Sequence, residues 1–325
     1  MVKKKIYIIA EIGLNHNGNI NTAKRLIRDA KEAGANAAKF QIFQPYTLGR
    51  DVKKKDTANP TWKKLYSSDS QILALVKFCK RLKIDFLCSV FDQQSLERVK
   101  KYKLKFIKVA SSEVNNLELL RKIKRSKIRP ILSTGMSNER EIAKAIKILV
   151  KPILLHCVSL YPCKVSKINL NRMIKLKKKF NLPIGFSDHS IGIDASKIAI
   201  LKGAEFIEKH FTYNKKIKGF DHLLSVEKNE LADLVSFAKN FKSYFGNGNI
   251  SPSREELKIQ KLARKGIYFK RPLKKEHLLT SSDLAFLRPQ NGLDINNYKF
   301  FLGKKLNRDV SKYQSLRKKY FKKII

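Results

Sequence analysis

KIYIIAE (residues 5–11) is a short apolar run that ends on a carboxylate, and seven runs of the same kind follow it. The others are AAKFQIF (37–43), FLCSVFD (86–92), KFIKVASSE (105–113), PILSTGM (130–136), ILLHCVS (153–159), IGFSDH (184–189) and EFIEKHF (205–211). A stretch with the apolar spacing of an amphipathic helix follows each run. Eight strand–helix units, with no glycine-rich dinucleotide-binding turn after the first strand, predict an α/β fold that closes into a (β/α)8 TIM barrel.

Helices are expected between these strands and after the last one. They cover residues 21–33, 70–82, 92–102, 115–126, 138–149, 169–180, 190–202 and 227–245. Several begin on Asn, Asp or Ser, the residues that cap helix N-termini. The barrel domain is therefore predicted to cover residues 1–245.

The sequence changes character after residue 245. GNGNISPSREE (246–256) is rich in Gly, Pro and Ser, so we predict a linker over residues 246–262. Beyond it, short strands are expected at 266–270, 285–287 and 306–310, and a basic tail at 317–325. Residues 263–325 are interpreted as a small β-rich domain. A domain of this size carries little core alone, so it is expected to pack on its own barrel or on a partner subunit.

Length and composition exclude some functional classes. The chain has 325 residues and 43% hydrophobic content, which is enough for a sizeable core. No apolar run approaches the roughly 20 residues that span a bilayer. Glu11 interrupts the run that follows the lysines at 3–5, so neither a membrane partner nor a signal peptide is predicted. The four cysteines have no paired spacing and are expected to be thiols in a reducing cytoplasm.

The net charge is +43, from 70 Lys and Arg residues against 27 Asp and Glu residues. Such a charge is typical of nucleic-acid binding. The lysines, however, are spread over almost every predicted helix, and they are not accompanied by the exposed aromatic side chains of a stacking platform. We therefore predict no nucleic-acid partner and expect the positive field to attract an anionic substrate.

Polar side chains stand at the ends of the predicted strands, where a barrel builds its active site. They are Glu11, Lys39, Gln41, Ser89, Lys108, Ser111, Ser133, Thr134, His156, Ser187, His189, Glu208 and His210. Because the strands of a barrel are parallel, we expect these side chains to meet at one rim.

Two histidines, His189 and His210, end the seventh and eighth strands, which are neighbours in a barrel. A lone histidine at this place is more often a structural hydrogen-bonding residue. Two imidazoles at one rim can share a divalent metal, and Glu208 and Asp221 add carboxylates nearby. Such a set suits Mn²⁺, Mg²⁺ or Co²⁺ without excluding Zn²⁺.

Two lysines, Lys39 and Lys108, end the second and fourth strands, and hydroxyl side chains end several others. A buried ammonium group is costly unless an anion meets it, so the lysines predict a cradle for a phosphate or carboxylate. The alternative is that they pair with Glu11 and Glu113 and bind nothing. Glu11 is also a candidate general base or electrostatic partner.

These segments together resemble the sialic acid synthases, a family that includes the synthases of legionaminic and pseudaminic acid. The resemblance is carried in order by AEIGLNHNG (10–18), KFQ (39–41), FIKVASSE (106–113), ILSTGM (131–136), LHCVSLYP (155–162), GFSDHSIGI (185–193), IEKHFT (207–212) and GFDHLLSVE (219–227). ARKGIYF (263–269), LKKEHLLTSSDL (273–284) and LRPQNG (287–292) resemble the antifreeze-like (SAF) domain that ends those enzymes.

The resemblance implies that phosphoenolpyruvate condenses with the open-chain aldehyde of an N-acylated mannosamine-type sugar and water, giving a nine-carbon 2-keto acid and phosphate. It implies metal binding, with Mn²⁺ preferred, by His189 and His210. It implies phosphoenolpyruvate binding by Lys39, Ser89, Lys108, Ser111, Ser133 and Ser187. It implies sugar contacts by Gln41, Tyr161, Glu208, Asp221 and Arg288. The expected catalytic residues are Glu11, Lys39, Lys108, Glu208 and Asp221.

The family pattern also implies a homodimer, in which Arg288 of the small domain reaches the sugar's N-acyl group over the other subunit's barrel. The chain departs from the pattern at Ser159, where Asn or Thr is frequent, at Phe220, where Pro is usual, and at Gln290, where Gly is usual. The insertion over residues 45–70 is short and basic, which leaves the acceptor sugar open. The pair Asp221-His222 is more like the sialic and legionaminic branches than the pseudaminic branch.

Two alternatives remain at this point. A related barrel could condense phosphoenolpyruvate with a different aldose, such as an aldose phosphate, but it would need a second phosphate site, and few arginines stand at strand ends. A barrel that has lost catalysis could bind anions only. That hypothesis leaves the buried charges at the strand ends unexplained.

Overall fold

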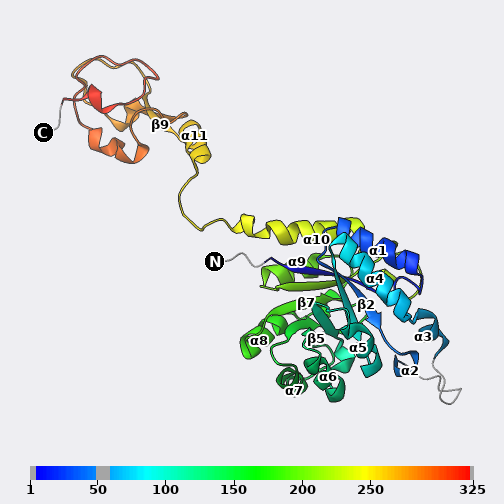
Figure 1. Ribbon diagram of the computed structural model, residues 1–325. Coiled ribbons are helices and arrows are strands. Elements are labelled where there is room, and N and C mark those ends of the chain that lie inside the picture. Colours follow the sequence, from blue (N-terminus) through cyan, green and yellow to red (C-terminus); the bar gives the residue numbers. More distant parts are fainter. Residues whose placement is uncertain (1–4, 49–58, 323–325) are drawn as a thin grey trace. The chain divides into compact units, whose positions relative to one another are not determined.

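The computed structural model describes residues 5–48 and 59–322, which fall into two compact units (Figure 1). The first unit is Met1–Phe245 and the second is Gly246–Ile325. The middle of the insertion that follows the second strand lies outside the described residues.

Eight parallel strands close the first unit into a barrel, which confirms the predicted fold class. They are β1 (Tyr7–Gly13), β2 (Ala37–Ile42), β3 (Asp85–Val90), β4 (Phe106–Val109), β5 (Arg129–Ser133), β6 (Ile153–Cys157), β7 (Ile184–Asp188) and β8 (Phe206–His210). Each strand pairs with the next along the chain, and β8 returns to β1.

The period of two along a strand decides which residues face the barrel interior. A buried apolar cluster fills the barrel interior on the side of the N-terminal ends of the strands. It consists of Ile9, Ala37, Leu87, Phe106, Ile131, Ile153 and Leu155. Two residues further along the same strands stand Glu11, Lys39 and Lys108. The polar residues therefore point into the barrel interior like the apolar cluster, but one layer nearer the C-terminal ends of the strands.

Helices follow the strands close to the expected positions. They are α1 (Ile20–Glu32), α4 (Asp69–Leu82), α5 (Gln93–Lys100), α6 (Leu117–Arg125), α7 (Glu139–Leu149), α8 (Leu170–Phe180), α9 (Asp194–Leu201) and α10 (Lys228–Asn240). Two short helices, α2 (Pro45–Leu48) and α3 (Pro60–Leu65), belong to the insertion after β2. The expected helix at 227–245 ends early, because Phe241–Phe245 forms a separate 3-10 turn. The helix expected from residue 190 begins only at Asp194, because Gly192 has a left-handed φ of +77° that an α-helix cannot contain.

The second unit is built on a two-stranded antiparallel sheet of β9 (Gly266–Phe269) and β10 (Leu284–Leu287). Helix α11 (Arg254–Ala263) occupies much of the expected linker and begins with a capping box between Ser253 and Glu256. The strand expected at 306–310 is absent from this unit as described. Only single bridges remain there, from Leu306 to Phe321 and from Leu273 to Val310.

The expected basic tail is wrong for its described part, residues 317–322. Tyr320 and Phe321 are buried in the small core of the second unit, beside Phe269 and Phe301. In a unit of this size, burial of these two rings outweighs the solvation of the neighbouring lysines.

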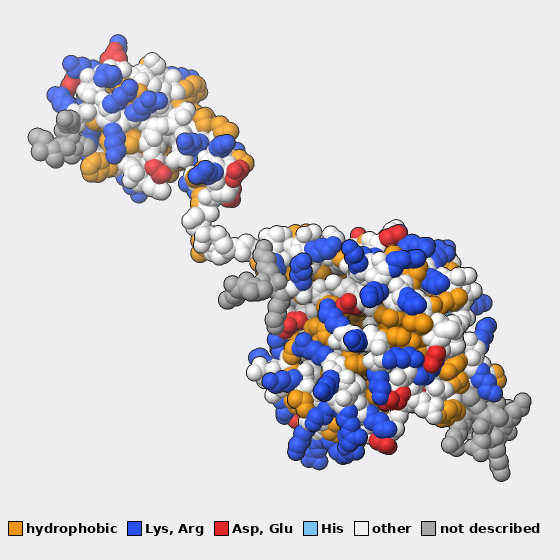
Figure 2. All heavy atoms as spheres, viewed as in Figure 1, with side chains coloured by type: hydrophobic (Ala, Val, Ile, Leu, Met, Phe, Trp, Pro, Cys, Tyr) orange, Lys and Arg blue, Asp and Glu red, His pale blue; other side chains and the backbone are white. Residues whose placement is uncertain are grey.

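Lys and Arg side chains occur over the whole visible face of both units (Figure 2). None of the helices in the described residues combines the length and the hydropathy that a membrane span requires.

Asp283 supplies a stability test within the second unit. Its buried carboxylate accepts hydrogen bonds from the Thr280 backbone at 3.0 Å, from the Thr280 hydroxyl at 2.8 Å and from Arg271 Nη2 at 2.9 Å, and it lies 2.9 Å from His277 Nε2. Burial alone would raise the pKa of Asp283, but the hydrogen bonds from His277, Thr280 and Arg271 outweigh it and hold that pKa well below its usual range. The carboxylate's stabilisation is therefore complete above the unfolded-state pKa of about 3.9 and is lost as the pH falls through the folded pKa.

We expect Asp283→Asn to lower the free energy of unfolding of the second unit by about 1–3 kcal/mol at neutral pH. The difference from the unaltered chain should shrink below about pH 4. Urea unfolding of the full chain, followed by pulse hydrogen exchange of peptides from 264–322, measures it. The control is Asp309→Asn, which removes an exposed carboxylate paired with Lys274. An equal loss in both variants would contradict the assignment.

Candidate active site

A cavity of about 400 Å³ opens at the C-terminal ends of the barrel strands. Every barrel residue to which a binding, metal or catalytic role was assigned lines it: Glu11, Lys39, Gln41, Ser89, Lys108, Ser111, Ser133, Tyr161, Ser187, His189, Glu208, His210 and Asp221. Thr134 and His156, also expected at this rim, do not line it, and the Thr134 hydroxyl donates to the Leu155 carbonyl at 3.2 Å instead. Arg288 lies in the second unit, after β10. The strand register explains the convergence, since Glu11 is opposite both Lys39 and His210, and Ser187 is opposite Glu208.

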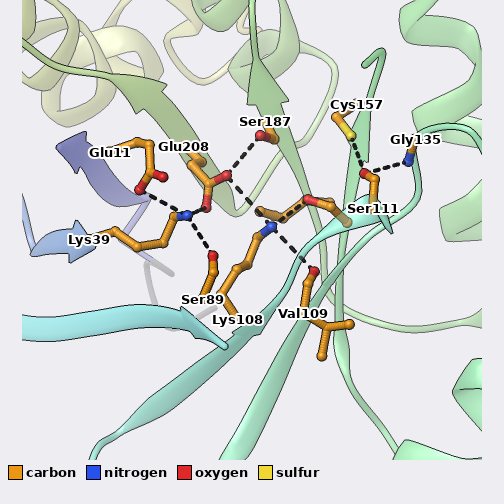
Figure 3. A network of polar contacts seen from close by, with 12 residues as sticks. Glu11, Lys39, Ser89, Lys108, Val109, Ser111, Gly135, Cys157, Ser187 and Glu208 are labelled. Carbon is orange, nitrogen blue, oxygen red and sulfur yellow. Dashed lines mark hydrogen bonds and ion pairs between the residues drawn. The ribbon is translucent and has the colours of Figure 1, made fainter. Parts of the chain in front are cut away.

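Two lysines and two carboxylates form the centre of the cavity (Figure 3). Lys39 Nζ lies 2.8 Å from Glu11 Oε2 and 3.6 Å from Glu208 Oε2. Lys108 Nζ lies 3.7 Å from Glu208 Oε1. Glu208 therefore stands between the two ammonium groups. Of the two carboxylates expected to pair with the lysines in the alternative interpretation, only Glu11 does so. Glu113 accepts hydrogen bonds from Ser112 and Asn116 instead.

Hydroxyl groups surround this centre. Lys39 Nζ donates to Ser89 Oγ at 3.0 Å, and Lys108 Nζ donates to Ser133 Oγ at 2.7 Å. Ser187 Oγ donates to Glu208 Oε1 at 2.8 Å. Ser111 Oγ accepts the Gly135 N–H at 3.0 Å and lies 3.1 Å from Cys157 Sγ. Ammonium and hydroxyl donors at this spacing suit a small anion with several oxygens.

The two carboxylates have pKa values that are pushed apart. Burial raises the pKa of Glu11 to about 7, although Lys39 opposes the shift. Burial would also raise the pKa of Glu208, but Lys108, Lys39 and the Ser187 hydrogen bond lower it to about 2. Two neighbouring carboxyls in such different environments can divide the work, one exchanging a proton near neutral pH and the other staying ionised.

His189 and His210 lie close together in the same cavity, with their ring centroids 5.5 Å apart. Burial, with His210 nearby, lowers the pKa of His189 to about 4. Burial, with Lys39 nearby, lowers the pKa of His210 to about 3. Both imidazoles are therefore neutral at pH 7, which is the state that ligates a metal.

The surroundings of the two rings fit a metal with few protein ligands. His189 Nδ1 is 2.8 Å from the Val158 carbonyl, a contact that fixes the ring and leaves Nε2 on its other side. His210 Nδ1 is buried without a hydrogen bond and lies 3.3 Å from Asp221 Oδ2. Within the described residues, no three His, Cys, Asp or Glu side chains gather as a ready-made metal cage. Two imidazoles would leave the other coordination positions to water and substrate oxygens.

Aromatic and apolar side chains form the rest of the wall. Tyr161 stacks on His189 with a centroid distance of 4.2 Å. The wall also includes Leu14, Trp62, Phe91, Met136 and Phe220. Trp62 was not predicted, because it lies in an insertion without a periodic pattern. It packs edge to face on Phe43, and it is the only tryptophan in the sequence.

Three other histidines have structural partners outside this cavity. His156 Nε2 is 2.8 Å from the Ile168 carbonyl, and His222 Nδ1 is 2.8 Å from Thr212 Oγ1. His277 is bonded to Asp283 in the second unit.

The family model and curated proteins that match this chain point to the same family. The sequence model of the NeuB family matches residues 26–250. The N,N'-diacetyllegionaminic acid synthase of Legionella pneumophila is 36% identical over 326 residues, covering 94% of this chain and 91% of that protein. The pseudaminic acid synthase of Campylobacter jejuni serotype O:23/36 is 32% identical over 340 residues, covering 98% and 97%.

A solved structure is similar as well. The crystal structure of N-acetylneuraminic acid (sialic acid) synthetase from Leptospira borgpetersenii, in complex with citrate, superposes with a TM-score of 0.71 at 35% identity. The match covers 78% of this chain and 90% of that one.

Proposed function

The chain belongs to the NeuB family, and we propose that it condenses phosphoenolpyruvate with an N-acylated mannosamine-type sugar and water, forming a nonulosonic acid and phosphate. The relatives support an enzyme of the sialic-type synthase family. The centre of the cavity supports the proposed substrates, because Lys39 and Lys108 flank Glu208 beside two neutral imidazoles.

Phosphoenolpyruvate offers two anionic groups to the two ammonium groups. Lys39, Ser89, Lys108, Ser111, Ser133 and Ser187 are proposed to hold its phosphate and carboxylate. The strongly positive chain would also raise the local concentration of such an anion.

In the proposed reaction, carbon 3 of the phosphoenolpyruvate double bond forms a bond to the aldehyde carbon of the sugar, and the aldehyde oxygen takes a proton from water. Positive charge develops at carbon 2, where the ionised Glu208 carboxylate stabilises it. Water then adds at carbon 2, and Glu11, with a pKa raised to about 7, accepts its proton. The carbon–oxygen bond to phosphate then breaks, the hydroxyl at carbon 2 gives its proton to the departing phosphate, and the keto acid and phosphate remain.

His189 and His210 are proposed to hold a divalent ion, with Mn²⁺ preferred over Mg²⁺ or Co²⁺. When bound, such an ion supplies Lewis-acid polarisation of the aldehyde. Gln41, Tyr161, Glu208 and Asp221 are proposed to orient the sugar. Arg288 of the partner subunit in a homodimer, carried by an antifreeze-like second unit, is the proposed contact to the N-acyl group.

The proposal is tested by incubating the purified chain with Mn²⁺, phosphoenolpyruvate and a panel of N-acylated sugars, with phosphate and keto-acid formation as readouts. The panel contains N-acetylmannosamine and diacetamido-trideoxy sugars, to separate the sialic, legionaminic and pseudaminic acceptors. We expect phosphate release only when a sugar is present. No turnover with any sugar would favour a barrel that only binds anions.

Gly135 gives a prediction about the phosphoenolpyruvate end of the cavity. A Cβ at this position would stand 2.4 Å from Ser159 Oγ and 2.8 Å from both Cys157 Sγ and Ser111 Oγ. We expect Gly135→Ala to raise the KM for phosphoenolpyruvate by about 10–100-fold, because overpacking costs about 1–3 kcal/mol. The measurement is steady-state phosphate release. Adding Ser159→Ala removes the closest atom and should restore part of the affinity, whereas an unchanged KM in the single variant would refute the prediction.

A further inference from the structure

A fully buried ion pair lies directly behind the two histidines. Asp188 is the last residue of β7 and Lys209 is the residue opposite it on β8. Both side chains are fully buried, and Lys209 Nζ lies 3.5 Å from Asp188 Oδ2. Neither residue lines the cavity. The mechanism proposed above does not use them.

The pair alternates with cavity residues along the two strands. Ser187 and Glu208 form one register pair and are hydrogen-bonded on the cavity side. Asp188 and Lys209 form the next register pair, and the period of two turns their side chains to the opposite face. There the Ser196 hydroxyl of α9 donates to Asp188 Oδ2 at 2.6 Å. His189 and His210 follow immediately and face the cavity again.

The pair also holds the backbone that follows His189. Asp188 Oδ1 accepts the Ser190 N–H at 2.8 Å and the Ser190 hydroxyl at 2.6 Å. Lys209 Nζ donates to the Ser190 carbonyl. Ser190 is thus held from both strands, so the chain on either side of His189 is fixed to the strand that carries His210.

Stability alone does not explain this arrangement. A buried ion pair is no more stabilising than apolar residues of similar shape, because both charges lose their hydration. Positioning a neighbouring group does explain it, since partners that orient metal-binding histidines set metal affinity.

We propose that Asp188 and Lys209 are positioning residues that fix the spacing of His189 and His210 for a shared divalent ion. This inference rests on the proposed metal site. It assigns the pair no contact with substrate, because both side chains turn away from the cavity.

The test compares the full chain with the double variant Asp188→Asn/Lys209→Met, which removes both charges at once and leaves neither unpaired. Mn²⁺ binding is measured by electron paramagnetic resonance on protein without substrate. Phosphoenolpyruvate binding is measured by the fluorescence of Trp62, which lines the cavity. Thermal unfolding without metal reports the fold. The control is Lys105→Met, which makes the same lysine replacement in an exposed ion pair. Lys105 Nζ lies 3.1 Å from Asp85 Oδ2 in that pair.

We expect the Kd for Mn²⁺ to rise by about 10–100-fold in the double variant. Phosphoenolpyruvate affinity and the unfolding temperature should stay close to those of the unaltered chain. Ser196→Ala, which removes only one hydrogen bond to Asp188, should weaken Mn²⁺ binding in the same direction by less.

Equal Mn²⁺ affinity in the unaltered chain, the double variant and Ser196→Ala would overturn the positioning role of Asp188 and Lys209. The proposed metal site would stand. If the double variant does not fold, the comparison with Ser196→Ala decides it. Absence of Mn²⁺ binding by the unaltered chain would overturn the proposed metal site and this inference with it.

Discussion

Replacing Lys108 by Met is expected to lower kcat/KM for phosphoenolpyruvate by about 10²–10³-fold, because truncating one partner of a buried charge pair costs about 2–5 kcal/mol. Lys108 is 3% exposed and joins Ser133 to Glu208. Without it, Glu208 keeps only the cation of Lys39, and the substrate anion loses one of its two ammonium partners. Steady-state phosphate release in the presence of the acceptor sugar measures the effect. Lys39→Met should behave in the same way.

The matched control is Lys105→Met, three residues earlier on the same chain segment. Lys105 is 58% exposed and pairs with Asp85 at the opposite ends of the strands. Its replacement should leave kcat/KM unchanged. If Lys108→Met retained full activity, the cavity could not be the phosphoenolpyruvate site.

Removing divalent ions with a chelator is expected to lower the rate of condensation by about 10²–10⁴-fold, because a Lewis acid contributes several kcal/mol at the aldehyde. Adding Mn²⁺ should restore the unaltered chain. His189→Ala and His210→Ala should lose the same activity without recovering it, since each removes one of two neutral imidazoles beside Glu208. Mn²⁺ binding to each variant is measured alongside the rate.

His277→Gln provides the control for the histidine variants. His277 lies in the second unit, bonded to Asp283, and should affect stability there without changing Mn²⁺ binding. Full activity in both His189→Ala and His210→Ala would exclude the proposed metal role.

The barrel could be predicted because each of its strands carries its own signal. An apolar run of a few residues followed by a helical period is a local pattern, and eight repeats leave few alternatives. Helix ends were less accurate. A helix was predicted from Ser190, a residue type that caps helices, but α9 begins at Asp194 because Gly192 has a left-handed backbone conformation.

The gathering of the candidate site could be predicted for a similar reason. Parallel strands bring their C-terminal ends together, so polar residues at those ends converge without knowledge of the packing. The partners within the site could not be predicted. Lys108 faces Glu208 rather than Glu113, and only the register of distant strands decides between two carboxylates of the same chemistry.

Apolar contacts outside the predicted strands and helices were also missed. Trp62 lines the cavity from an insertion whose sequence has no hydrophobic periodicity. Tyr320 and Phe321 were not predicted to be buried, because lysines surround them in the sequence. Both belong to the hydrophobic core of the second unit.

The most direct measurement of the proposed function uses phosphoenolpyruvate labelled with ¹³C at carbon 3, followed by nuclear magnetic resonance in the presence of Mn²⁺ and the acceptor sugar. The account predicts that the vinyl signal is replaced by the methylene signal of a nine-carbon keto acid, with equal release of phosphate. Phosphate release accompanied by the methyl signal of pyruvate, with the sugar unchanged, would contradict it.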